Sequence, residues 1–131
     1  MGTWGFGSFD NDDAGDWICE LPEAEDTSVL DEAFSRVIEC DGYLEAPDCS
    51  VAIAAAEVVA ALRQRLGVEP PAQVGEFASR IASPPSPALV VAALRALERV
   101  KTKSELQELW DESDSRAEWH QAVAELEGRL R

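Results

Sequence analysis

Apolar residues recur along this chain with the spacing of α-helices. In most segments they stand three or four positions apart, which places them on one face of a helix. No segment alternates apolar and polar residues over the length of a strand between hairpin turns. The pattern therefore predicts about seven helices and no sheet. Their apolar positions lie within residues 14–21, 30–38, 51–62, 74–81, 88–100, 106–110 and 119–130.

Capping residues predict where several of these helices begin. Asp48 is expected to cap a third helix that runs to Leu66. Ser86, followed by a proline, is expected to cap the fifth helix. Residues 102–105 and 115–118 each place Ser or Thr three positions before Glu, which is typical of a capping box. These two sequences predict the starts of the last two helices.

The third helix is expected at the centre of the fold. Between residues 51 and 62 it carries one charged residue, Glu57, and is apolar on nearly every face. The fifth helix is also apolar until Arg95, so we expect it to pack beside the third. Unequal helix lengths and frequent prolines favour an irregular orthogonal bundle over an up-and-down four-helix bundle. The length of 131 residues predicts one all-α domain, residues 1–131.

The first residues differ from the helical body. Three glycines interleave with three aromatic residues, a pattern of tight turns held by aromatic anchors. We expect residues 1–12 to form an arm that docks on the bundle. The glycines are Gly2, Gly5 and Gly7, and the aromatic residues are Trp4, Phe6 and Phe9.

Negative charge is concentrated in the first half of the chain. The formal net charge is −15. Residues 1–60 contain 15 Asp and Glu against Arg36 alone, a net of −14, whereas residues 61–131 contain 11 acids against 10 bases. Such a surface repels nucleic acid and anionic lipid and is complementary to a basic protein partner. We expect no nucleic-acid binding and no membrane binding.

No segment predicts export or membrane insertion. The start of the chain lacks a charged region followed by an apolar region, so it does not resemble a signal peptide. The apolar run of residues 51–62 is too short to span a bilayer. We therefore expect a cytoplasmic protein.

The usual catalytic and metal-binding constellations are missing from the sequence. Cys19, Cys40 and Cys49 have no CxxC spacing, and His120 is the single histidine. We expect reduced, mostly buried thiols, a half-exposed histidine without a role, and no resident metal or cofactor. An enzymatic function is therefore not favoured, although carboxylate chemistry remains open.

An acidic cluster of residues 10–16 has two interpretations. Its carboxylates are ligands that a hard cation such as calcium would accept. An EF-hand loop that begins at Asp10 fails, however, because Ala14 and Leu21 occupy two ligand positions. Acids at a helix N-terminus also cap free amides and complement the helix dipole. This second interpretation is the simpler one, so we predict no metal site.

Glu57 is the most suggestive single residue, because a carboxylate within an apolar helix requires a partner. Arg95 or Arg99, an indole N–H, or amides of the arm are the candidate partners. The alternative is a ligand pocket in which Glu57 and two other carboxylates converge beneath the arm. The predicted ligand-binding residues are Trp4, Asp12, Asp16 and Glu57.

Several sequence features resemble the bacterial DUF4259 family. The features are the opening of residues 2–12 with Asp16-Trp17 after it, Tyr43-Leu44-Glu45-Ala46-Pro47 before the Ala-rich helix with Glu57, Leu109-Trp110, and the closing helix of residues 119–130. The resemblance covers the whole chain. It implies a bacterial cytoplasmic protein and brings no activity with it.

The sequence thus leads to two functional hypotheses. The first is a non-enzymatic binding or regulatory protein, immunity-like or inhibitor-like, whose acidic N-terminal half contacts a basic protein partner. The second is a small-ligand- or metal-binding domain, or a hydrolase-type enzyme, that uses Asp12, Asp16 and Glu57 beneath the Trp4 arm. A third alternative is self-association through the Ala-rich helices.

Overall fold

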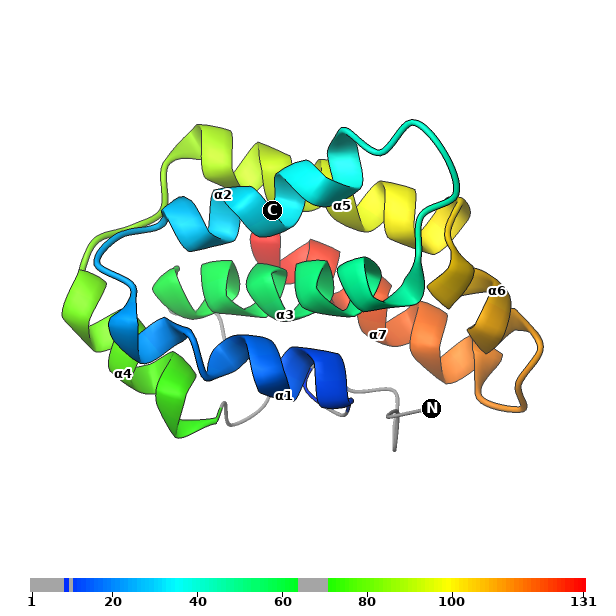
Figure 1. The fold of residues 1–131 in the computed structure, drawn as a ribbon, viewed down its shortest axis with the longest axis horizontal. Coiled ribbons are helices and arrows are strands. Elements are labelled where there is room, and N and C mark those ends of the chain that lie inside the picture. The colour runs from blue at the N-terminus through cyan, green and yellow to red at the C-terminus, as the bar shows by residue number, and fades with distance from the viewer. Residues whose placement is uncertain (1–8, 10, 64–70) are drawn as a thin grey trace.

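The computed structural model of the chain describes residues 9, 11–63 and 71–131. This part of the chain contains seven α-helices, one 3-10 turn and no strand, which confirms the prediction of an all-α bundle (Figure 1). Most of the expected arm, including Trp4, lies outside the described residues. The elements are α1 (Asp12–Ile18), the 3-10 turn η1 (Leu21–Glu23), α2 (Ser28–Ile38), α3 (Ala46–Leu62), α4 (Ala72–Ile81), α5 (Pro87–Thr102), α6 (Glu105–Asp111) and α7 (Arg116–Leu130).

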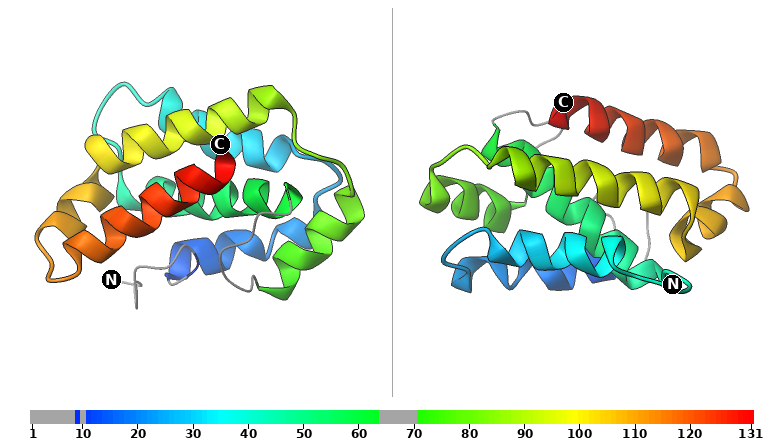
Figure 2. Two further views of the ribbon diagram at one scale, coloured as in Figure 1. Left: turned by 180° about the vertical axis from the view of Figure 1, so that it is seen from behind. Right: turned by 90° about the horizontal axis from the view of Figure 1, so that it is seen from above.

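Helix α3 is the centre of the bundle. It contacts each of the other six α-helices, with α1 and α2 on one side and α5 and α7 on the other (Figures 1 and 2). Every residue from Cys49 to Leu62 is buried except Val51, which is half-buried. The prediction of a central third helix with the fifth helix beside it is confirmed. The apolar surface of α3 requires this arrangement, because it has no polar face to turn toward water.

The ends of α3 differ from the prediction. The helix begins at Ala46, so Asp48 lies in its first turn and is not its cap. The first amide is capped from another helix, since the Ala46 N–H donates to Glu105 Oε1 at 2.7 Å. The helix ends at Leu62 and not at Leu66. A cap supplied from α6 is a tertiary contact, which local sequence patterns do not encode.

Caps of the later helices follow the sequence more closely. The Leu89 N–H donates to Ser86 Oγ at 3.1 Å, so the predicted cap of α5 is confirmed. The predicted box of residues 102–105 is wrong, because Thr102 is the last residue of α5. Ser104 caps α6 instead, with its Oγ accepting from the Gln107 N–H at 3.0 Å. A two-residue shift of this kind arises because α5 extends further than its apolar stripe.

The amphipathic helix α2 determines which charges face outward. Its buried stripe packs on α3 and α5, so the opposite face carries its charged residues into solvent. No helix in the described part of the chain is both long and apolar enough to cross a membrane. The buried stripe of α2 is Leu30, Ala33, Phe34 and Val37.

Candidate functional site

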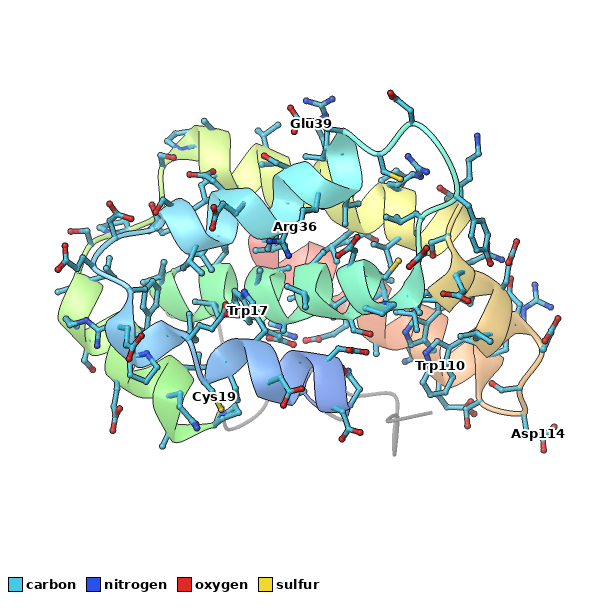
Figure 3. The ribbon with its side chains drawn as sticks, in the orientation of Figure 1. Trp17, Cys19, Arg36, Glu39, Trp110 and Asp114 are labelled. Atoms are coloured by element: carbon cyan, nitrogen blue, oxygen red, sulfur yellow. The ribbon has the colours of Figure 1, made fainter. Side chains whose placement is uncertain are left out.

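A hollow of about 240 Å³ opens between α1 and α2, above α3. Its apolar lining comes from all three helices. In Figure 3 the side chains of Trp17 and Arg36 both lie over α3, in the space between α1 and α2. The three helices therefore build one concave site on the acidic half of the chain. The apolar lining residues are Trp17, Val29, Ala33 and Val51.

The rim of this hollow is acidic. Asp16 is exposed on α1, Glu20 is exposed in the turn that follows this helix, and Glu32 lines the hollow from α2. Arg36, one turn after Glu32, is the cation of the rim. It is exposed and forms no salt bridge with any residue that the structure describes. Three carboxylates against one guanidinium leave the rim with a net negative charge.

The acidic surface continues around α2 and onto the start of α3. A second, shallower depression follows the outer face of α2, and Figure 3 shows Glu39 at the end of that helix. Four carboxylates and Arg36 line it, so its charge has the same sign as the hollow. We call the hollow and this depression together the acidic face. The carboxylates of the depression are Asp31, Glu32, Glu39 and Asp48.

Sequence reasoning singled out Asp16 but missed the other residues of the hollow. The available signal was the four-residue spacing of Glu32 and Arg36, which places that pair on one polar helix face. Asp16 lies on the polar face of the preceding helix, and Glu20 follows the end of that helix. The sequence does not show that the two faces oppose each other across α3, because that depends on how the helices pack.

The aspartates of the acidic cluster do not cap α1, although two of them lie in its first turn. Asn11 is the N-cap of α1, with its Oδ1 accepting from the Ala14 N–H at 2.8 Å. Asp12 and Asp13 are exposed in the first turn, where negative charge complements the helix dipole. Among residues 9, 11–63 and 71–131, no group of three His, Cys, Asp or Glu side chains is placed to hold a metal ion. Asp10 lies outside the described residues.

Glu57 is buried and forms a bidentate ion pair with Arg129 of α7. Arg129 Nη1 donates to Glu57 Oε1 at 2.7 Å, and Nη2 donates to Oε2 at 3.0 Å. Only 7% of the Glu57 side chain and 15% of the Arg129 side chain are exposed. The pair raises the pKa of Arg129, mainly through the Glu57 hydrogen bond. The expected structural pairing of Glu57 is present, with a partner that the sequence did not reveal.

The prediction that Arg95 or Arg99 pairs with Glu57 is wrong. Arg95 is exposed on α5. Arg99 instead donates to the Cys40 carbonyl at 2.9 Å and to the Gly42 carbonyl at 3.0 Å, which fastens the loop after α2. Either arginine was a candidate because the fifth helix was expected to pack beside the third. The face of α3 that carries Glu57 is covered by α7, a pairing that helical periodicity does not specify.

The predicted convergence of carboxylates is not present among the described contacts. Asp12 and Asp16 are exposed on α1, whereas Glu57 is buried against Arg129. No hydrogen bond between described residues joins Glu57 to either aspartate. Trp4, the fourth residue of that hypothesis, lies outside the described residues.

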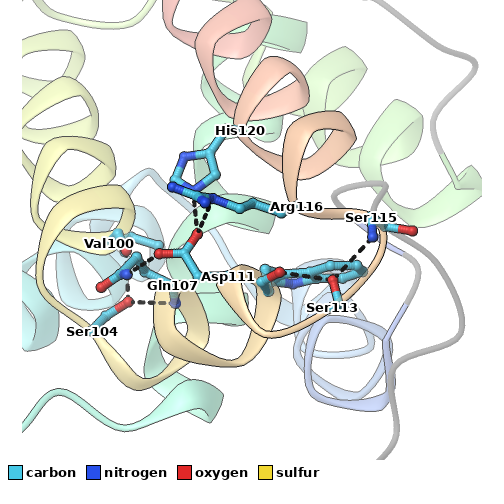
Figure 4. Close-up of polar contacts among 9 residues, drawn as sticks. Val100, Ser104, Gln107, Asp111, Ser113, Ser115, Arg116 and His120 are labelled. Atoms are coloured by element: carbon cyan, nitrogen blue, oxygen red, sulfur yellow. Dashed lines mark hydrogen bonds and ion pairs between the residues drawn. The ribbon is translucent and has the colours of Figure 1, made fainter.

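His120 and Asp111 form a polar cluster where α6 meets α7 (Figure 4). His120 Nε2 lies 2.7 Å from Asp111 Oδ1, and Arg116 Nε lies 3.3 Å from the same oxygen. Asp111 also accepts a hydrogen bond from Gln107. These contacts, the His120 hydrogen bond first, lower the pKa of Asp111. His120 was expected to be half-exposed and without a role, and the structure gives it a structural one.

The cysteines do not form a nucleophilic site with the histidine. Cys19 is exposed, Cys40 is half-buried and Cys49 is buried, so the expectation of mostly buried thiols holds for Cys49 alone. Burial raises the pKa of Cys49 to about 11, which keeps its thiol protonated at neutral pH. The imidazole of His120 is engaged by Asp111 of α6.

The Glu57–Arg129 pair predicts an unequal response to two similar substitutions. Glu57→Gln removes the buried one of the two carboxylates that pair with Arg129, and is expected to lower the free energy of unfolding by about 3 kcal/mol. Glu125→Gln removes a carboxylate from the same arginine, but Glu125 is 55% exposed, so we expect a loss below about 1 kcal/mol. Urea unfolding measures both. Equal losses would show that the buried Glu57 contributes no more to the free energy of unfolding than the exposed Glu125 does.

The Asp111 cluster predicts a pH dependence of stability. Because the folded pKa of Asp111 lies below the ordinary value of 3.8 for an aspartate, ionised Asp111 stabilises the native state above about pH 4. This contribution is lost as the pH falls through the folded pKa. Asp111→Asn should therefore lower the free energy of unfolding at pH 7, and its difference from the wild type should shrink below about pH 4. Urea unfolding between pH 3 and 7 measures this difference, with Asp114→Asn at an exposed position as the control. A difference between Asp111→Asn and the wild type that does not change with pH would contradict the prediction.

Comparison with known proteins identifies the family. The model of a family described as a domain of unknown function, DUF4259, matches residues 2–122. No curated protein and no solved structure matches the chain. The matched residues include the acidic face, Glu57 and the cluster around His120. The match ends within α7, before Arg129. The chain belongs to the DUF4259 family.

Proposed function

We propose that this chain is a non-enzymatic binding protein whose acidic face contacts a basic surface of a protein partner. The observation that carries the proposal is the position of the charge. The rim of the hollow and the outer face of α2 present their carboxylates to solvent with Arg36 as the one cation that lines them. Such a field attracts a basic partner over a long range and repels polyanions.

The rest of the described surface supports this choice over an enzyme. Glu57, the carboxylate with the most buried position in the acidic half, is held in an ion pair with Arg129. The single histidine is engaged by Asp111. These groups have structural partners, whereas the carboxylates of the acidic face are exposed, apart from the half-buried Asp48. Exposed charges act on encounter and specificity, which are the properties that a neutralising protein of the immunity or inhibitor kind requires.

The proposal predicts that a basic protein is captured through the acidic face. The immobilised full chain should retain, at low salt, a protein of isoelectric point above about 9 from a lysate of the source organism. The triple variant Asp31→Asn/Glu32→Gln/Glu39→Gln should weaken this retention at least about tenfold, because it removes three charges from the outer face of α2. Retention should also fall steeply as salt is added.

A matched control separates a surface effect from a change in net charge. Glu112→Gln/Asp114→Asn/Glu118→Gln also removes one Asp and two Glu charges, all from exposed positions near the loop between α6 and α7. This variant should retain the partner as the wild type does. An equal loss in both variants, or capture of proteins without a basic bias, would contradict the proposal.

A further inference from the structure

We infer that the hollow between α1 and α2 receives an arginine side chain of the basic partner. The inference rests on the proposed function and adds to it a specific anchor point. General charge complementarity would be satisfied anywhere on the acidic face. The hollow differs from the rest of that face because it combines an apolar floor with carboxylates on opposite sides.

The floor of the hollow includes the most accessible residue of the otherwise buried part of α3. In residues 49–62 of that helix, Val51 alone is not buried. Val29 of α2 is half-buried beside it, and Trp17 of α1 keeps 8% of its surface exposed. These side chains leave an apolar surface that the aliphatic part of a long side chain would cover.

The size of the hollow favours a single side chain over a small-molecule ligand. Its volume of about 240 Å³ lies below the roughly 300–1,000 Å³ typical of ligand and cofactor pockets. It is open on the outer side, where the rim stands, so a side chain enters from a partner lying across α1 and α2. The dimensions and the opening agree with an anchor residue at the centre of an interface.

The rim selects for arginine among the cationic side chains. Asp16 on α1 and Glu20 in the turn after α1 line one side, and Glu32 on α2 lines the other, so carboxylates flank an incoming group from two directions. A guanidinium has five donors in a planar fork and is weakly hydrated, which suits contact with several carboxylates above an apolar floor. A lysine ammonium is a compact, strongly hydrated charge that loses more on leaving water.

Arg36 is the internal competitor for this site. Its side chain lies over α3 at the same rim and makes no salt bridge with a described residue (Figure 3). A second cation in the hollow would be repelled by it. A second copy of this chain does not suit the hollow, because two acidic faces repel each other.

The direct test is a titration of the ¹⁵N-labelled full chain with two capped peptides, hexa-arginine and hexa-lysine, at low salt. We expect hexa-arginine to bind at least about threefold more tightly and to shift the Trp17 indole N–H and the Val51 amide. Val51→Phe fills the hollow and should remove the arginine preference while leaving the weaker charge-driven binding. Val91→Phe, at a valine of α5 that is 53% exposed, is the matched control and should keep the preference.

Arg36 supplies a second arm of the test. Arg36→Gln should strengthen hexa-arginine binding by about threefold, because it removes the repulsion at the rim. Arg95→Gln, also an exposed arginine on a helix, should have a much smaller effect. Weaker binding after Arg36→Gln would overturn the assignment of the hollow to a cation.

The outcomes separate this inference from the proposed function. One outcome overturns the arginine anchor and keeps the acidic face. In it, hexa-arginine binds and binding depends on Asp31, Glu32 and Glu39. The signals of Trp17 and Val51 do not shift, however, and Val51→Phe binds as the wild type does. Equal affinity for the two peptides also overturns the anchor. If neither peptide binds, both the anchor and the proposed function fail.

Discussion

The burial of α3 is the constraint on which the rest of the structure depends. Thirteen of its seventeen residues are buried, and they leave no polar face that could remain in water. Its apolar surface must therefore be covered on all sides, which α1 and α2 do from one side and α5 and α7 from the other. The other helices are amphipathic because each has one side against this centre and one side in solvent.

The same constraint places the charges of the acidic half. Residues 1–60 carry a net charge of −14, and only Glu57 of the described acids in that range is buried. Glu57 is stabilised there by the fork of Arg129, which satisfies both of its oxygens. Apart from Asp48 in the first turn of α3, the other described acids lie on α1, α2 and the loops, so the acidic face is a consequence of covering α3 with two acidic helices. The binding function that we propose for the acidic face rests on that position.

Features that depend on periodicity were predictable from the sequence. The all-round apolar character of residues 51–62 identified the central helix, and Ser86 identified the start of α5. Features that depend on how the helices pack were not predictable from the sequence. Glu105 caps α3 across 59 positions and Arg129 meets Glu57 across 72, and no local pattern specifies either contact. The hollow belongs to the second group, because the partial exposure of Val51 depends on the spacing of α1 and α2 over α3.

Hydrogen exchange of the backbone amides tests the central position of α3 most directly. If α3 is covered on every side, its amides between Ala52 and Ala60 exchange only when the whole protein unfolds. Their free energies of exchange should then equal the free energy of global unfolding measured with urea, and should exceed those of α1 and α6. Amides of α3 that exchange through a local opening, at free energies no higher than those of α1, would contradict the account.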